Sequence, residues 1–194
     1  KVDNKGVLRI AKNITEIKKV NKNFNSKLKY LKFSDKFFFR KVQDNEINRY
    51  LKSRNLPVNR KVSVSVKKIN RLDHYIWWFS TKRDSFVMII NNNKIMYLYD
   101  ETINIKNKNY SLQGWFACGD KLGIKEILIA LNWHQKYMKK KQEIDLSFGI
   151  IKKGNKINFS KYLSWNPVQK NSHEYEILKK ICKVDEKYNY YSRY

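Results

Sequence analysis

The sequence predicts a mainly β fold, a small barrel or sandwich of short strands, followed by an α+β extension. Short apolar runs alternate with turn-rich stretches over the N-terminal two thirds of the chain, as in small all-β folds. After Gly123 the hydrophobic period becomes helical. Hydrophobic residues make up 42% of the 194 residues, so a packed core can form despite the high charge.

The first elements are read from turn signals and apolar runs. Residues 3–6 (DNKG) predict a turn, because Asn and Gly tolerate a positive φ. Residues 7–12 predict a short strand, and residues 13–34, rich in Lys and Asn, a loop or irregular ribbon. Residues 36–42 (KFFFRKV) predict a strand. A charged, helix-like insertion at 45–54 follows.

The cleanest alternation is residues 61–69, KVSVSVKKI. Val62, Val64 and Val66 fall on one face of the expected strand, and serines and a lysine fall on the other. We therefore expect the three valines to share a buried face of the longest strand.

Three further runs are interpreted as strands. Residues 75–79 and 86–91 form an expected strand pair across the basic turn at 80–84, and residues 94–99 follow the NNN turn.

The C-terminal part mixes helix and strand. Cations cluster at the far end of the helix that starts after Gly123, where the macrodipole favours them. Residues 144–151 and 156–159 predict a hairpin, and 172–182 predicts a helix capped by Ser172. The helical period after Gly123 is carried by Ile124, Ile127, Leu128, Leu131 and Met138.

Charge suggests the class of partner. Lys and Arg number 42 against 17 acidic residues, a net charge of +25, which makes nucleic acid the default partner. An anionic membrane surface is a second interpretation, but no clean basic amphipathic helix supports it.

The two cysteines, Cys118 and Cys182, form no disulfide framework and suit a reducing compartment. The abundance of Lys, Asn, Ile, Phe and Tyr indicates an AT-rich genome.

The order of several blocks resembles the family of universal large-subunit ribosomal protein fourteen (the L-fourteen family). Val2, Asp3, Asn4, Gly6 and Arg9 stand in the order of its opening motif. SDKFFFRKV, NRKVSVSVKKI, IWWFSTKRDSFVMIINNN and LQGWFACGDKLGIKEILIAL follow in the order of its later blocks. The last block departs from the family, because Gly114 stands where the family has Arg and Ala117-Cys118 replaces Gly-Pro.

The resemblance implies a fold and a set of contacts. It implies a five-stranded β-barrel with a β-ribbon and a C-terminal helix over 1–131, with 132–194 as a lineage-specific extension. We expect this extension to be ordered, because it carries too many aromatic residues for a disordered basic tail. Among the basic residues only Arg9 maps onto a motif position, and the other basic contacts are chosen by charge and placement. The residues expected to contact rRNA are Asn4, Arg9, Lys12, Arg40, Lys41, Arg60, Lys61, Lys67, Lys68, Lys82 and Arg83.

The function implied is that of a non-catalytic, organelle-encoded protein of the mitochondrial large ribosomal subunit, in the mitochondrial matrix. Its expected partners are large-subunit rRNA, a neighbouring protein of the L-nineteen family and small-subunit rRNA across an intersubunit bridge. The ribosomal silencing factor is a further expected partner. No cofactor, metal or membrane is expected.

Enzyme interpretations stay open beside this one. LQGWFACGD echoes the LAGLIDADG motif of homing endonucleases, but Ala117 and Gly119 fall at its two Asp positions. A basic ribonuclease toxin could pair His173 with Glu174. A zinc site lacks the close ligand pairs that such sites favour. The four residues that could gather round a zinc ion are Cys118, His134, His173 and Cys182.

Overall fold

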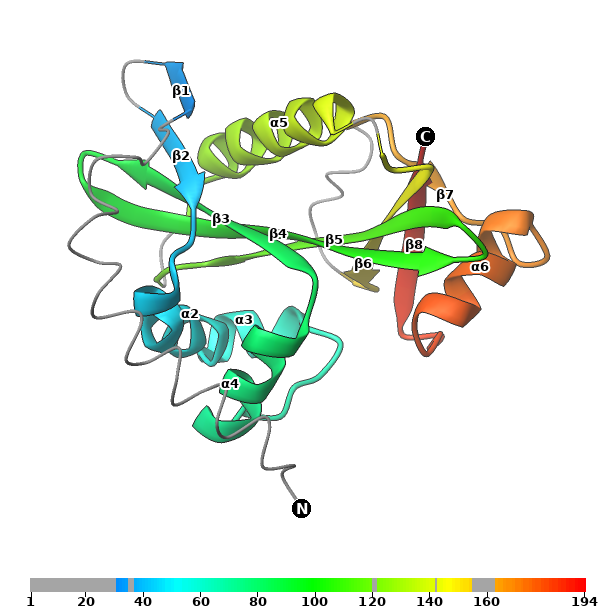
Figure 1. Ribbon diagram of the computed structural model, residues 1–194, viewed down its shortest axis with the longest axis horizontal. Coiled ribbons are helices and arrows are strands. Elements are labelled where there is room, and N and C mark those ends of the chain that lie inside the picture. Colours follow the sequence, from blue (N-terminus) through cyan, green and yellow to red (C-terminus); the bar gives the residue numbers. More distant parts are fainter. Residues whose placement is uncertain (1–30, 35–36, 120–121, 142, 155–162) are drawn as a thin grey trace.

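The computed structural model describes residues 31–34, 37–119, 122–141, 143–154 and 163–194 (Figure 1). Its strands form one open sheet of eight strands, in the order β1-β2-β3-β4-β5-β6-β8-β7. The sheet is mixed, because β5 and β6 pair in parallel and the other neighbours pair antiparallel. The prediction of a small five-stranded barrel is therefore wrong. The strands are β1 (Leu31–Ser34), β2 (Phe37–Lys41), β3 (Arg83–Ile90), β4 (Asn93–Ile105), β5 (Lys108–Ala117), β6 (Leu146–Lys152), β7 (Asn166–Pro167) and β8 (Tyr188–Arg193).

Helices cover both faces of this sheet. Figure 1 shows α5 on one face and α2, α3 and α4 on the other, with α6 beside β6 and β8. Across the described ranges, none of these helices is both long and apolar enough to span a bilayer. The helices are η1 (Asp44–Glu46), α2 (Ile47–Arg54), α3 (Pro57–Val62), α4 (Arg71–Ser80), α5 (Ile124–Lys140) and α6 (His173–Ile181).

The central strands supply a core on each face. Phe86 and Met88 of β3 pack with Trp133 of α5. Val87, between them in sequence, points to the other face and packs with Tyr50 of α2. Because both faces are covered, β3 has the continuous apolar sequence FVMII and not an alternating one. Each fully buried side chain of this kind contributes about 1.5–3 kcal/mol to stability.

The valine-rich stretch at 61–69 is not a strand, so that prediction is wrong. Pro57 occupies the first turn of α3, where its fixed φ favours a helix, and α3 ends at Val62. The residues beyond it, up to α4, form no regular element. Val62, Val64 and Val66 are 46%, 58% and 55% exposed. Alternation alone did not make a strand here, because none of the described strands forms a backbone ladder with this stretch.

The aromatic run at 75–79 is helical, which contradicts the predicted strand pair. The Asn70 side chain caps α4 by accepting a hydrogen bond from the Asp73 backbone N–H at 2.8 Å. His74 and Trp78 then face Tyr50, at ring distances of 5.9 and 5.1 Å. The other arm of the pair, 86–91, is confirmed within β3, and 94–99 is confirmed within β4.

The predicted helices are confirmed. The insertion at 45–54 forms η1 and α2, and the helical period after Gly123 forms α5 with lysines in its last turn. Ser172 caps α6, since its hydroxyl accepts a hydrogen bond from the Tyr175 backbone N–H at 3.2 Å. The strand at 36–42 is confirmed by β2, and 144–151 contributes β6.

The two predicted segments contribute to one sheet. The boundary at 131 falls inside α5, and β5 of the first segment pairs with β6 of the second. The C-terminal segment is ordered where it is described, in β6, β7, α6 and β8. The opening turn, the strand at 7–12 and the hairpin arm at 156–159 lie outside the described residues.

Candidate functional site

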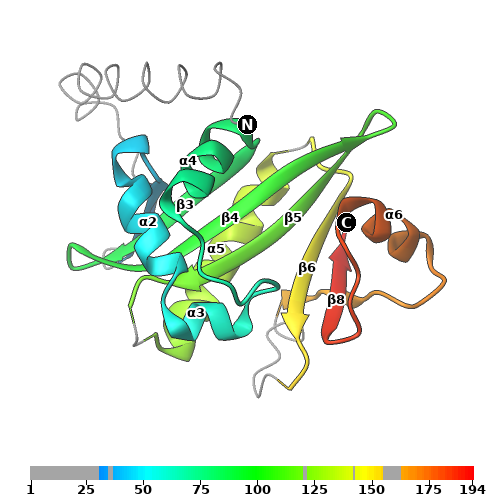
Figure 2. The same cartoon turned by 90° about the horizontal axis from the view of Figure 1, so that it is seen from below.

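The parallel strands β5 and β6 diverge toward their carboxyl ends. They pair only where Tyr110–Gln113 lies beside Leu146–Gly149. Beyond Gln113, β5 continues to Ala117 beside β4, whereas β6 continues to Lys152 beside β8 (Figure 2). We call this opening the β5–β6 splay. In open α/β sheets, ligands bind outside the carboxyl ends of parallel strands, so the splay is the first place to look for a site.

A segment from the opposite layer lies against the strands of the splay. The Asn59 side chain donates to the Ala117 carbonyl oxygen at 2.8 Å and accepts from the Ala117 N–H at 3.0 Å. Lys152 of β6 donates to the Lys61 carbonyl oxygen at 3.0 Å. The Tyr188 hydroxyl of β8 lies 3.2 Å from the carbonyl oxygens of Ser63 and Val64. We call residues 59–64 the bridging segment, because it contacts β5, β6 and β8.

At the apex of the splay, Tyr99 lies across Gly114. The two residues are partners in the β4–β5 ladder, and Gly114 is the first residue of β5 beyond its pairing with β6. A Cβ at position 114 would collide with the Tyr99 phenol, so the ring can lie there only because residue 114 is Gly. The Tyr99 hydroxyl is therefore placed at the apex, on the face covered by α2 and α4.

Arg83 fixes the other side of the Tyr99 ring. Its guanidinium lies 4.0 Å from the Tyr99 ring centroid and 4.5 Å from that of Trp77. Glu101 completes the arrangement with an ion pair to Arg83 at 2.5 Å. Cation–π stacking on both rings and this ion pair hold the aromatic rings in place.

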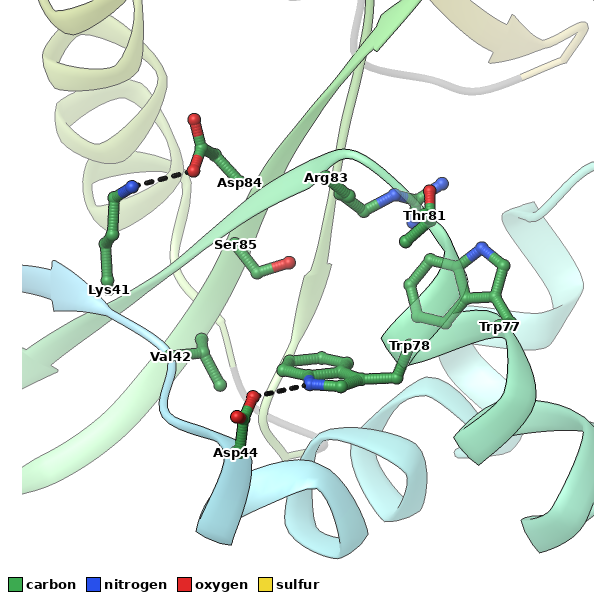
Figure 3. A pocket seen from close by; sticks show the side chains of 9 residues that line it. All are labelled: Lys41, Val42, Asp44, Trp77, Trp78, Thr81, Arg83, Asp84 and Ser85. Atoms are coloured by element: carbon green, nitrogen blue, oxygen red, sulfur yellow. Dashed lines mark hydrogen bonds and ion pairs between the residues drawn. The ribbon is translucent and has the colours of Figure 1, made fainter. Parts of the chain in front are cut away.

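A small pocket lies next to this stack, and Arg83 is part of its wall (Figure 3). Its volume is about 180 Å³. An ion pair between Lys41 and Asp84 at 2.7 Å lies on one side, and a hydrogen bond from the Trp78 indole to Asp44 at 2.9 Å on the other. The pocket and the apex of the splay therefore share a wall. The lining residues are Lys41, Val42, Asp44, Trp77, Trp78, Thr81, Arg83, Asp84 and Ser85.

The connection that leaves the carboxyl end of β5 leads to the N-terminus of α5. Gly123 is the N-cap of this 17-residue helix and provides no side-chain cap. The first N–H groups of a helix lack partners within it and attract anions. One feature opposes an anion, since the Glu126 carboxylate lies close enough to Gly123 to collide with a Cβ there. That carboxylate ends a flexible side chain in the first turn.

The histidines and cysteines form no common site. In the ranges the structure describes, no three His, Cys, Asp or Glu side chains are grouped so as to hold a metal ion. His134 pairs with Asp100 at 3.3 Å, and His173 is exposed at the start of α6. Burial raises the pKa of the Cys118 thiol to about 12, so this cysteine is a poor nucleophile at neutral pH.

The residues expected from sequence to bind rRNA are scattered. Arg40 is buried in an ion pair with Glu46 at 2.6 Å, and Lys82 is exposed just before β3. Lys41 and Arg83 both line the pocket of Figure 3. A second group, Arg60, Lys61, Lys67 and Lys68, lies on α3 and the stretch that follows it. Asn4, Arg9 and Lys12 lie outside the described residues.

Comparison with known proteins finds similar folds among solved structures. No family model matches the chain, and no curated protein does. Solved structures do match. A domain from Methanocaldococcus jannaschii aligns with a TM-score of 0.64 and 18% identity, over 81% of this chain and 97% of that one. RimL, the ribosomal L7/L12 alpha-N-protein acetyltransferase, in complex with coenzyme A, aligns with a TM-score of 0.58 and 10% identity, over 85% and 97%. An acetyltransferase of the GNAT family from Streptococcus pneumoniae aligns with a TM-score of 0.58 and 4% identity, over 81% and 98%.

The chain has the GNAT fold. This finding overturns the assignment to the L-fourteen family, because the described strands form an open sheet and not that family's barrel, and structural neighbours include GNAT acetyltransferases. The non-catalytic ribosomal function, the rRNA and ribosomal-protein partners and the expectation of no enzyme activity are corrected with it. The neighbours with this fold are enzymes that transfer acetyl groups, not structural components of a ribosome.

Sequence reasoning missed the β5–β6 splay and the placement of Tyr99 over Gly114. The change of period at Gly123 predicted a helix, but not that LQGWFA, a Gly-containing turn and this helix form a crossover to a parallel strand. That order of strand, turn, helix and strand was the available signal. Tyr99 gave none, because a tyrosine in a strand is unremarkable until its neighbour Gly114 is seen beneath it.

Proposed function

We propose that this chain is an acyltransferase that takes its acyl group from a coenzyme A thioester. The observation that carries the proposal is the β5–β6 splay, where two parallel strands of a GNAT fold separate at their carboxyl ends. RimL, which shares this fold, has been solved with coenzyme A bound.

The residues at the splay fit such a cofactor. Coenzyme A is a long molecule that carries a diphosphate and a ribose phosphate, and these phosphates require cations or free N–H groups. The N-terminus of α5 offers N–H groups with no side-chain cap, and a net charge of +25 attracts an anion from a distance. The ladder between β5 and β6 ends at Gln113, so the two strands separate at their carboxyl ends, and the Asn59 side chain occupies the β5 edge at Ala117. When bound, coenzyme A supplies the activated acyl group as a thioester.

Tyr99 is the proton donor that we assign to this site. Its hydroxyl lies at the apex of the splay, and Arg83 stacks on its ring at 4.0 Å. A phenol hydroxyl at that place would donate a proton or a hydrogen bond to the thiolate that leaves the thioester, and would regain a proton from the amine that forms the new amide bond. Glu101 is engaged by Arg83 at 2.5 Å, so we assign it the role of holding Arg83 and not that of a general base.

We propose an amine as the acyl acceptor. RimL is described as an alpha-N-protein acetyltransferase. The α-amino group of a protein is therefore the first acceptor to test here. The acceptor reaches the apex from the face covered by α2 and α4, where the Tyr99 hydroxyl lies.

Calorimetric titration with acetyl-CoA, followed by an assay of thiol release with amine acceptors, tests the proposal. Gly123→Asp puts a negative charge at the N-terminus of α5. Since Asp is also a favourable N-cap, this variant should fold. We expect it to weaken acetyl-CoA binding about tenfold or more, because the carboxylate repels phosphate and occupies N–H groups. Asn132→Asp makes the same charge change on an exposed position of α5 and should leave binding unchanged. If acetyl-CoA does not bind the folded protein, or if both variants bind it alike, the proposal fails.

A further inference from the structure

Beside the splay the protein exposes four valines on one short stretch. Val58 and Val62 lie on α3, and Val64 and Val66 lie in the irregular stretch after it. They are 43%, 46%, 58% and 55% exposed. Single exposed apolar residues scattered over a protein surface need no explanation, but four half-exposed valines within nine residues of sequence do.

The same stretch is strongly basic. From Ile47 to Leu72 the sequence contains eight Lys and Arg residues and no Asp or Glu. Lys67 and Lys68 directly follow the valines and are both exposed. We call Val58, Val62, Val64, Val66, Lys67 and Lys68 the valine–lysine surface.

This surface is fixed beside the splay by hydrogen bonds to the strands. Asn59 bonds the Ala117 backbone of β5, and the Lys61 carbonyl oxygen accepts from Lys152 of β6. Tyr188 of β8 contacts the Ser63 and Val64 carbonyl oxygens at 3.2 Å. The carbonyl groups of this stretch therefore point at the strands, while the valine side chains remain exposed.

We infer that the valine–lysine surface docks the acyl acceptor, and that this acceptor is an acidic protein segment with apolar side chains between its acidic ones. This inference rests on the proposed function. Carboxylates of the segment meet Lys67 and Lys68, and its apolar side chains cover the valines. The docked segment then lies beside the splay, where its free amine meets the acyl group.

The valines are what favour a protein segment over other polyanions. A phosphate backbone would use the lysines and leave four apolar side chains in water. An apolar side chain of a peptide buries them, at roughly 25 cal/mol per Å² of apolar surface. Charge then sets the rate of encounter and the selectivity, and burial adds affinity.

The probe for the test is a synthetic decapeptide with a free N-terminus, acidic residues alternating with leucines and a fluorescent label at its C-terminus. Peptide binding is measured by fluorescence anisotropy without acetyl-CoA, and the KM for the peptide with saturating acetyl-CoA. Lys67→Glu with Lys68→Glu should raise both the Kd and the KM for the peptide about tenfold or more, with kcat and acetyl-CoA affinity unchanged. Val64→Ser with Val66→Ser should raise both by about three- to tenfold.

A matched control separates local from global charge. Lys106→Glu with Lys108→Glu makes the same charge change at two exposed positions, in the turn after β4 and at the first residue of β5, and should leave peptide binding unchanged. The inference is overturned if the control weakens peptide binding as much as the Lys67 and Lys68 pair does. It is also overturned if single-stranded RNA displaces the peptide and its own binding is unaffected by the valine changes, which would make the surface a general polyanion site. If acetyl-CoA fails to bind while the peptide binds as described, the proposed function fails and the docking surface stands.

Discussion

The side-chain amide of Asn59 pairs with both backbone groups of Ala117, donating to its carbonyl oxygen at 2.8 Å and accepting from its N–H at 3.0 Å. An asparagine thus takes the place of a neighbouring strand at the carboxyl end of β5. Asn59 is 3% exposed, so the bonds form away from water and both partners depend on them.

Replacing Asn59 by Ala should lower the free energy of unfolding by about 2–4 kcal/mol, because two buried backbone groups of Ala117 lose their partner. Urea unfolding followed by circular dichroism measures the change. Asn132→Ala, at an exposed position of α5, is the control and should change stability by less than about 0.5 kcal/mol. Equal effects of the two substitutions would show that the Asn59 bonds contribute nothing specific.

Gly114→Ala should destabilise the protein by about 1–3 kcal/mol, because the new methyl group collides with the Tyr99 ring. In the background of Tyr99→Ala the same change should cost much less, since the ring is gone. A double-mutant cycle of urea unfolding measures this coupling. Strict additivity of the two substitutions would contradict the placement of Tyr99 over Gly114.

Tyr99→Phe should lower kcat about 10- to 100-fold while leaving the Kd for acetyl-CoA unchanged, because only the hydroxyl that donates the proton is lost. Steady-state kinetics and calorimetry on the same preparation separate the two quantities. The matched control is Tyr75→Phe on α4, whose hydroxyl bonds Asn48 at 2.6 Å, and it should retain full kcat. A Tyr99→Phe enzyme with unchanged kcat would remove Tyr99 from the reaction.

His74 should make the protein sensitive to mild acid. Burial lowers its pKa from 6.5 to about 4, with nearby Arg83 and Arg54 acting in the same direction. As the pH falls below 6.5, the unfolded chain takes up a proton on this residue before the folded protein does, so stability falls until the pH reaches about 4. Between about pH 7.5 and pH 5 the loss should be roughly 2 kcal/mol.

The measurement is urea unfolding of the wild type and of His74→Phe at both pH values. The substitution should remove most of this pH-dependent loss, whereas His173→Gln, at an exposed position, should not. A pH dependence that is the same in all three proteins would show that His74 is not the group responsible.

The sequence predicted those helices whose ends carry capping or charged residues that favour a helix terminus. Ser172 before Glu174 and Glu176 identified α6, and the apolar period with lysines at its end identified α5. The strands β2, β3 and β4 were recognisable as apolar runs. These features depend on neighbours in sequence, so a single sequence reveals them.

Tertiary partners decided the rest. The stretch KVSVSVKKI has the pattern of a strand but forms no backbone ladder with any of the described strands, and only side chains of β6 and β8 reach it. YIWWF becomes helical because Asn70 caps it and Tyr50 packs on its face. The resemblance to the L-fourteen family depended on both stretches being strands, and on an opening block that lies outside the described residues. The order of strand, turn, helix and strand indicates that β5 and β6 pair in parallel, but nothing local to either strand shows where the two separate.

The valine–lysine surface also has a consequence for how the protein behaves at high concentration. A valine-rich, β-prone stretch that is exposed to solvent is a site for intermolecular strand pairing, and adjacent charges are what oppose it. Lys67 and Lys68 act as those charges here, and the contacts of Tyr188 with the Ser63 and Val64 carbonyls engage part of the backbone that a second molecule would need. High salt screens the lysines but leaves the valines exposed. Self-association in concentrated salt is therefore expected to begin at this stretch, and a bound acidic segment should suppress it.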